Sequence, residues 1–206
     1  MKKNFVSNSS DSVRMFRNNF LESLSKVPFY VPLIVYIPLM IYMSWRSFSV
    51  EKMSVYDFVL SVGAGLLVWT LIEYVLHRFV FHFHPKSRIG QRIHFIFHGV
   101  HHDYPNDAKR LVMPPSASIP LAFLFFLVFK LILPEYFLYS SFTGFIAGYL
   151  IYDMTHYALH HHSFKSKFWI KLKKHHMLHH YSDETKGYGV SSALWDGIFK
   201  TNFPKK

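Results

Sequence analysis

The sequence predicts an all-α integral membrane protein with about four transmembrane helices. Half of its 206 residues are hydrophobic and 19% are aromatic, including 22 Phe and 13 Tyr. A soluble globule of this length has difficulty burying so much apolar surface. The apolar residues also gather in four runs, each close to the length of about 20 residues that crosses a bilayer as a helix.

The first two apolar runs are Val27–Trp45 and Phe58–Leu76. The first run carries no charge, and the second carries only Glu73, close to its end. Gly63 and Gly65 in the second run would let another helix approach closely. Three prolines in the first run are expected to kink its helix: Pro28, Pro32 and Pro38.

The third and fourth runs are Ala117–Leu133 and Phe137–Tyr152, with only three residues between them. So short a connection predicts a tight helical hairpin. Gly144 and Gly148 form a GxxxG pattern in the fourth run, which is consistent with close helix packing but common by chance.

Four crossings place both chain ends and residues 77–116 on one side of the membrane. All Lys and Arg residues except Arg46, Lys52 and Lys130 lie on that side. Positively charged segments flank membrane helices on the cytoplasmic side, so we expect this side to be cytoplasmic. The net charge of +11 then fits lipid headgroups, and we expect no nucleic acid partner.

The first 26 residues are polar and mildly basic, without the apolar core or cleavage site of a signal peptide. We divide the chain into this N-terminal tail, residues 1–26, and a membrane-embedded domain, residues 27–206. Weak amphipathic spacing within the tail fits either a segment on the membrane surface or a disordered tail. The residues that form it are Val13, Phe16, Phe20, Leu21 and Leu24.

The histidines form the clearest chemical pattern. The chain has no Cys, so a metal must be held by His or by carboxylates. All 15 histidines lie in the two segments assigned to the cytoplasmic side, mostly in the clusters HRFVFH, HGVHH, HYALH and HMLHH. These clusters supply ten candidate metal ligands: His77, His82, His98, His101, His102, His156, His160, His176, His179 and His180.

The spacing within the clusters suits helices. His98 is three and four residues from His101 and His102, which places these imidazoles on one helical face. The other HxxHH cluster repeats this spacing, and HYALH has the spacing of i and i+4. His77 and His82 lie about 140° apart on an ideal helix, so they meet at one site only if the helix end unwinds or bulges.

Ten imidazoles are too many for one metal ion and suit two, with four or five ligands each. Imidazole binds zinc, copper, iron and nickel, so the residue type alone does not choose the metal. A helical cytoplasmic cap holding a dimetal site is therefore part of the predicted fold. His94 is expected to lie outside the ligand set but near it. Four further histidines are expected to be solvated or to lie beside ligands: His84, His161, His162 and His175.

Carboxylates are expected to balance the charge of such a site. Asp153 lies three residues before His156, on the same helical face, where it can accept a hydrogen bond from a ligand ring. The alternative for Asp153 is a helix-end charge at the membrane interface. Three other carboxylates are weaker candidates: Glu73, Asp183 and Asp196.

The order HxxxxH, HxxHH, HxxxH and HxxHH, split by a membrane hairpin, resembles the fatty acid hydroxylase superfamily of integral membrane diiron enzymes. Three stretches are similar to its fatty acid 2-hydroxylase branch: RLVMPP at 110–115, YDMTHYALHH at 152–161 and GYGVSSALWDGIF at 187–199. The resemblance covers about residues 58–203. It implies that the ten clustered histidines bind the metals, and it makes Asp153 and Tyr152 candidate catalytic residues.

The resemblance also implies the reaction. We expect two iron ions, which zinc can replace in purified protein, and dioxygen as co-substrate. The expected substrate is a fatty acid or ceramide, hydroxylated at the alpha carbon of its acyl chain. Eukaryotic members often carry an N-terminal haem-binding domain, for which this chain has no room. The electron donor is then a separate haem-containing electron-transfer protein or a ferredoxin-like reductase.

The expected location is the inner membrane of a bacterium or the endoplasmic reticulum of a eukaryote. Sterol desaturation, or hydroxylation of a carotenoid or another lipid, is the main alternative within the superfamily. A metal transporter is another alternative, but it should place ligands near the middle of its spans. A single structural zinc site uses fewer ligands than the ten present.

Overall fold

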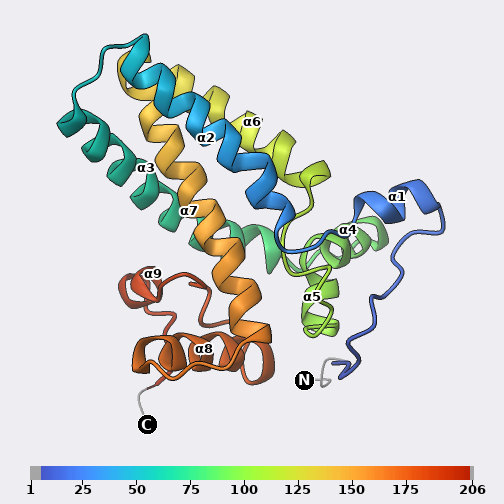
Figure 1. The fold of residues 1–206 in the computed structure, drawn as a ribbon. Coiled ribbons are helices and arrows are strands. Elements are labelled where there is room, and N and C mark those ends of the chain that lie inside the picture. Colours follow the sequence, from blue (N-terminus) through green and yellow to red (C-terminus); the bar gives the residue numbers. More distant parts are fainter. Residues whose placement is uncertain (1–5, 205–206) are drawn as a thin grey trace.

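The computed structural model describes residues 6–204, and over that range the regular structure is helical, as predicted (Figure 1). The helices are α1 (Asn19–Leu24), α2 (Val31–Ser49), α3 (Val55–Val75), η1 (Leu76–Phe81), α4 (Arg88–His94), η2 (Phe95–Gly99), α5 (Val100–Asp103), α6 (Pro115–Ile132), α7 (Glu135–His161), α8 (Lys167–Tyr181) and α9 (Leu194–Ile198). The segments η1 and η2 are π-helices.

Among the described residues, three helices are long and apolar enough to cross a membrane: α2, the continuous helix Val55–Phe81, and α6. The protein is therefore a membrane protein. The fourth predicted span lies in α7, which packs against α2, α3 and α6 (Figure 1). Polar side chains such as Ser140 and Thr143 are buried in α7, because this helix contacts its neighbours over most of its surface.

The ends of the helices follow local sequence signals. Ser54 caps α3 by accepting a hydrogen bond from the Asp57 N–H, and Ser87 caps α4 in the same way. The expectation of three proline kinks in the first span is wrong. Pro28 lies before α2, and Pro32 lies in its first turn, where a missing N–H costs nothing. Pro38 alone of the three lies inside the helix.

Close contact between α3 and α7 depends on glycine. A Cβ atom on Gly65 would lie 1.8 Å from the Ser141 carbonyl oxygen, and one on Gly144 would lie 2.0 Å from that of Val62. The GxxxG pattern in α7 therefore marks a real helix contact. Gly63 differs, because a Cβ atom there would meet open space, so the expectation that Gly63 supports close packing is wrong.

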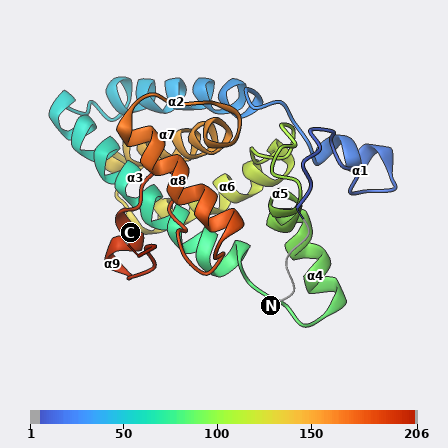
Figure 2. The same ribbon diagram turned by 90° about the horizontal axis from the view of Figure 1, so that it is seen from below.

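The two turns assigned to the opposite side of the membrane meet at one end of the bundle. Arg46 at the end of α2 forms an ion pair with Glu135 at the start of α7, with 2.7 Å between Nη2 and Oε1. The Tyr136 hydroxyl donates to Asp57 at the start of α3 over 2.8 Å. The histidine clusters lie at the other end, where α8 packs against α7 (Figure 1). Figure 2 views the molecule from that end.

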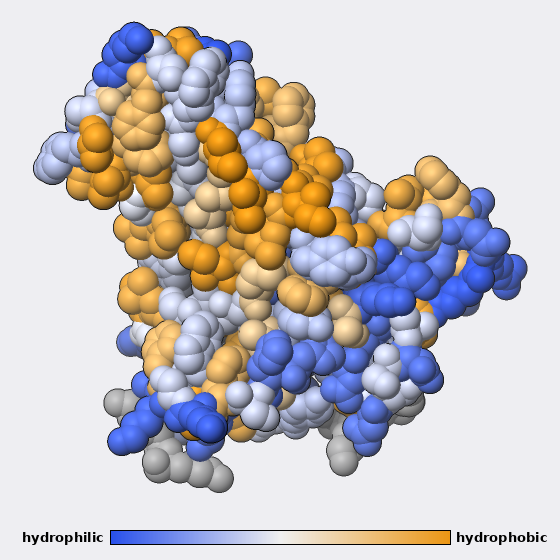
Figure 3. Space-filling view, viewed as in Figure 1, coloured by the Kyte–Doolittle hydropathy of each residue, from blue (hydrophilic) through white to orange (hydrophobic). Residues whose placement is uncertain are grey.

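The surface changes character between the two ends. Hydrophobic side chains cover much of the bundle in the view of Figure 3, while hydrophilic ones gather over the lobe of α1, α4 and α5 and at the lower end. The described part of the N-terminal tail, from residue 6, packs in this lobe. Residues 1–5 lie outside the described residues. The division at residue 26 stays a prediction.

Candidate metal centre

The structure brings all ten candidate ligands together in two groups. In each group, the five ligand nitrogens lie within 4.8 Å of one another. The first group contains His77, His82, His98, His102 and His179. The second group contains His101, His156, His160, His176 and His180.

Each HxxHH cluster divides between the two groups. His98 and His102 belong to the first group, whereas His101 between them belongs to the second. On α8 the pattern is inverted, because His179 joins the first group while its neighbour His180 joins the second. Consecutive histidines point about 100° apart on a helix, so each pair can serve two sites. The rings of His102 and His180 stack at 4.2 Å where the two groups meet.

The π-helix η1 brings together His77 and His82, which are five residues apart in the sequence. The N–H of His82 donates to the carbonyl of His77 over 3.1 Å, the i to i+5 bond of a π-helix. This wider turn brings the two Nε2 atoms within 3.3 Å of each other. The local distortion expected from the sequence is therefore present. The cluster on η2 and α5 also begins in a π-helix.

The nitrogen spacing fits a metal ion in each group. Neighbouring Nε2 atoms are 2.9–3.3 Å apart in the first group and 2.9–3.1 Å apart in the second. Two ligands at right angles, each about 2.1 Å from a metal, would lie about 3 Å apart. Rings crowded in this way cannot satisfy one another's lone pairs, but a cation between them can.

Two rings of the first group are held by backbone carbonyls. The Nδ1–H of His77 donates to Tyr188 over 2.5 Å, and that of His179 donates to Lys186 over 2.7 Å. Each bond fixes the tautomer and leaves Nε2 free to bind a metal. Burial lowers the pKa of His179 to about 4, so its ring is neutral at pH 7. Burial and neighbouring imidazoles also lower the pKa of His101 well below its usual value.

Those two carbonyls belong to a loop, residues 186–191, that is held by two buried carboxylates. Asp196 accepts the backbone N–H groups of residues 188 and 189 at 2.9 and 2.8 Å. Glu73 accepts those of residues 190 and 191 at 2.7 and 2.8 Å. The sequence ranked both carboxylates below Asp153, because their contact with the site runs through a loop that spacing does not reveal.

Asp196 also contacts His175, one of the histidines outside the two groups. His175 lies 3.0 Å from the Asp196 carboxylate, and Thr201 donates to the same carboxylate over 2.7 Å. Burial alone would raise the pKa of Asp196, but these hydrogen bonds hold it below its usual value. His84, His161 and His162 are exposed, as expected for solvated neighbours. The ring of His94 lies 5.8 Å from that of His84, outside both groups.

We expect the substitution Asp196→Asn to weaken metal binding in the first group by about 10–100-fold, because the loop carbonyls would no longer hold His77 and His179. Metal binding in the second group should be unchanged. Stepwise removal of metal by a chelator, followed by metal analysis, measures both affinities. Asp57→Asn removes another hydrogen-bonded carboxylate, at the far end of the bundle, and serves as the control. Equal losses in both groups would contradict the prediction.

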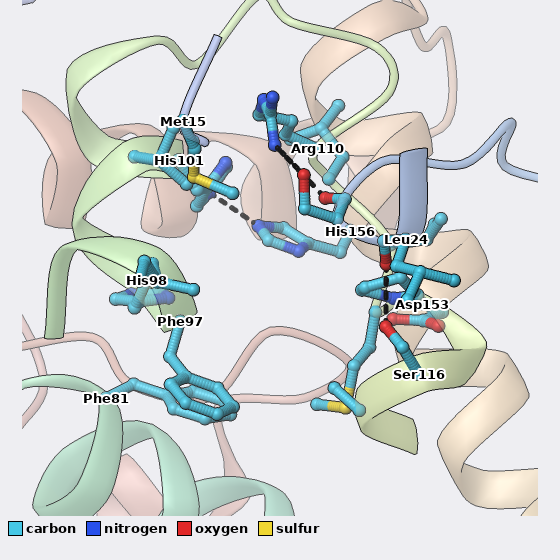
Figure 4. A pocket seen from close by; sticks show the side chains of 18 of the residues that line it. Met15, Leu24, Phe81, Phe97, His98, His101, Arg110, Ser116, Asp153 and His156 are labelled. Atoms are coloured by element: carbon cyan, nitrogen blue, oxygen red, sulfur yellow. Dashed lines mark hydrogen bonds between the residues drawn. The ribbon is translucent and has the colours of Figure 1, made fainter. Parts of the chain in front are cut away.

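A cavity of about 330 Å³ reaches both groups of histidines. His98 of the first group lines it together with His101 and His156 of the second (Figure 4). Most of the remaining lining is apolar, including Phe81 and Phe97. An apolar chain in this cavity can therefore reach both groups.

The candidate catalytic residues Asp153 and Tyr152 line the same cavity. Asp153 is 1% exposed, and neither carboxylate oxygen has a well-aligned hydrogen-bond partner among the described residues, although the Tyr149 hydroxyl lies close by. The expected bond to a ligand ring is not formed, so the carboxylate does not orient His156. Figure 4 shows Asp153 beside the cavity, between His156 and Ser116.

The fold and the site define a helical membrane protein with two adjoining histidine groups suited to metal ions. The family model for fatty acid hydroxylases matches residues 62–201. The chain belongs to the fatty acid hydroxylase family.

Curated relatives agree with this assignment. The chain is 38% identical to fatty acid 2-hydroxylase of Rattus norvegicus over 215 residues, with 94% of this chain and 58% of the relative aligned. It is 38% identical to a dihydroceramide fatty acyl 2-hydroxylase of Arabidopsis thaliana, with 94% and 81% covered. The chain thus spans 58% of the length of the rat relative.

A solved structure has the same fold. It is that of full-length scs7p, in which only the hydroxylase domain is visible, and it superposes with a TM-score of 0.85. The two sequences are 40% identical, and the match covers 90% of this chain and 70% of the other.

Proposed function

We propose that this chain hydroxylates an acyl lipid, a fatty acid or a ceramide, at the alpha carbon next to the carbonyl. The observation that carries the proposal is the cavity, whose largely apolar wall meets His98, His101 and His156. Relatives named for hydroxylation at carbon 2 of fatty acids and dihydroceramide acyl chains support the position of attack.

In this proposal, each histidine group holds one iron ion, and zinc can replace iron in purified protein. When bound, the pair of irons activates the co-substrate dioxygen for hydroxylation of an unactivated C–H bond. The chain itself holds the imidazoles neutral and oriented and keeps water away from the acyl chain. Asp153 and Tyr152 contact the polar end of the substrate from the wall of the cavity.

The reaction needs a partner, because inserting one oxygen atom of dioxygen and releasing the other as water consumes two electrons. We assign this role to a separate haem-containing electron-transfer protein or ferredoxin-like reductase. The histidine end faces the cytoplasm, which is supported by the many Lys and Arg residues at that end. The membrane is the inner membrane if the source is bacterial and the endoplasmic reticulum if it is eukaryotic.

The direct test is lipid mass spectrometry of cells with and without the gene, grown under isotopically labelled dioxygen. We expect an acyl lipid to gain one labelled oxygen, and fragmentation to place that oxygen on the alpha carbon. Cells carrying the His101→Ala variant provide the control for expression without a complete metal site. If no lipid gains a single labelled oxygen, the chain is not a hydroxylase. A label elsewhere on the acyl chain would refute the position.

A further inference from the structure

Residues 13–25, which we call the strap, form one wall of the cavity at the histidine groups. Met15, Phe16, Leu21, Leu24 and Ser25 all line the cavity. Met15 is buried, whereas Leu21 and Leu24 of α1 are 46% and 41% exposed. The strap therefore extends from the inner part of the cavity to its outer rim.

One arginine fastens the strap at both ends and in the middle. The side chain of Arg110 is 2% exposed, and its Nε–H donates to the Val13 carbonyl over 2.9 Å. Its Nη1 donates to the Ser25 carbonyl over 3.1 Å, and its Nη2 forms a 2.7 Å ion pair with Glu22. A planar guanidinium with five donors can make all of these contacts, and a lysine cannot.

The acidic partners of Arg110 shape the strap further. Glu22 accepts the backbone N–H groups of Met15 and Phe16, each over 3.0 Å, which folds the strap around its own carboxylate. Asp107 accepts the N–H of Val13 over 3.1 Å. These contacts fix the backbone of the segment that carries the apolar lining residues. A solvated polar tail would not form such a buried network of hydrogen bonds, so the strap is an ordered part of the cavity wall.

The rim of the cavity adjoins the membrane. Ser116 and Ala117, in the first turn of the membrane-spanning helix α6, also line the cavity. The Ser116 hydroxyl donates to the Leu24 carbonyl over 2.6 Å, which joins α1 to the start of α6 (Figure 4). Across the cavity, Phe97 is 57% exposed. Hydrophobic atoms cover the upper side of the lobe at the position of α1 (Figure 3).

We propose that the strap is part of the lipid site: it receives the acyl chain, and its rim is the lateral entrance from the bilayer. Arg110 is the positioning residue that holds this wall in place. The inference rests on the proposed hydroxylase function. An apolar chain that enters between α1 and Phe97 runs along Met15 and arrives at His98 and His101.

Photo-crosslinking tests the proposal without turnover. The full chain, loaded with metal, is placed in phosphatidylcholine vesicles with a ceramide whose sixteen-carbon acyl chain carries a diazirine, and a matching diazirine fatty acid is used in parallel. We expect label on residues 13–25 that excess unlabelled lipid removes, alongside label on the spans that it does not remove. Competed label confined to other segments would overturn the proposal. No electron donor is present in this experiment, so the position of the label does not depend on whether the chain hydroxylates the lipid.

Variants of Arg110 test its contacts with the strap, which we call the clasp, and a variant of Met15 tests the wall of the cavity. Arg110→Met should reduce competed labelling and raise KM by about tenfold, with metal content and kcat nearly unchanged, and Arg110→Lys should lie between. Met15→Trp fills the cavity without touching the clasp and should also reduce labelling, which keeps the proposal testable if Arg110 variants fold poorly. Arg46→Met removes an ion-paired arginine at the other end of the bundle and is the control. Wild-type labelling in Arg110→Met and Met15→Trp would refute the proposal.

Discussion

Replacing His101 with Ala should remove the metal of the second group, and replacing His179 with Ala should remove that of the first. Either variant should bind fewer than two metal ions per chain and lose activity by at least about 100-fold, because losing outer partners of a ligand already costs about 10–100-fold. Metal analysis of the purified variants and product formation measure the two effects. A metal content of two in either variant would contradict the ligand assignment.

The split between neighbouring histidines makes this prediction specific. His102→Ala should behave like His179→Ala, not like His101→Ala, because His102 and His179 share the first group. Metal analysis of double variants separates the groups: His102→Ala with His179→Ala should lose no more metal than either single variant, whereas His102→Ala with His101→Ala should lose both metals. His161→Ala is the control, since His161 follows the candidate ligand His160 but is exposed. Loss of metal in the His161 variant would show that the effect is not confined to the two groups.

Replacing Asp153 with Asn should lower kcat/KM by about 100-fold, the scale of a positioned group that contacts the reacting substrate. The substitution keeps the shape of the side chain but replaces an ionisable carboxyl group beside the cavity with a neutral amide. The metal content should stay at two, because Asp153 has no bond to a ligand ring. Steady-state kinetics and metal analysis distinguish a role of Asp153 in contacting the substrate from a role in orienting His156.

The control for Asp153 is Asp103→Asn, a partly buried carboxylate on the ligand-bearing helix α5 that does not line the cavity. Tyr152→Phe should lower kcat/KM in the same direction as Asp153→Asn. Loss of metal in Asp153→Asn would return Asp153 to a role in orienting His156. Unchanged kinetics would remove it from the site.

Much of the fold was predictable because each span carries its signal locally. Hydropathy and length located α2, α3 and α6, and the short turn at Pro134 predicted the hairpin of α6 and α7. The proline kinks were predicted wrongly, because an apolar run does not reveal where its helix begins. Gly63 was predicted wrongly because the sequence does not tell which face of α3 meets α7. Local patterns predict helices but not the faces they pair.

By itself, the sequence determined the residue type of the candidate ligands and the end of the bundle at which they lie. With no Cys and all histidines at one end of the spans, imidazoles had to gather there, and the spacing in HRFVFH required a distorted helix end. Only the tertiary structure decided how ten rings divide into two groups, since His101 and His102 are neighbours in sequence but belong to different groups. Only the tertiary structure shows that Arg110 contacts the strap and that Glu73 accepts hydrogen bonds from residues 190 and 191. These pairings join residues far apart in the chain, and which of them meet is decided by packing.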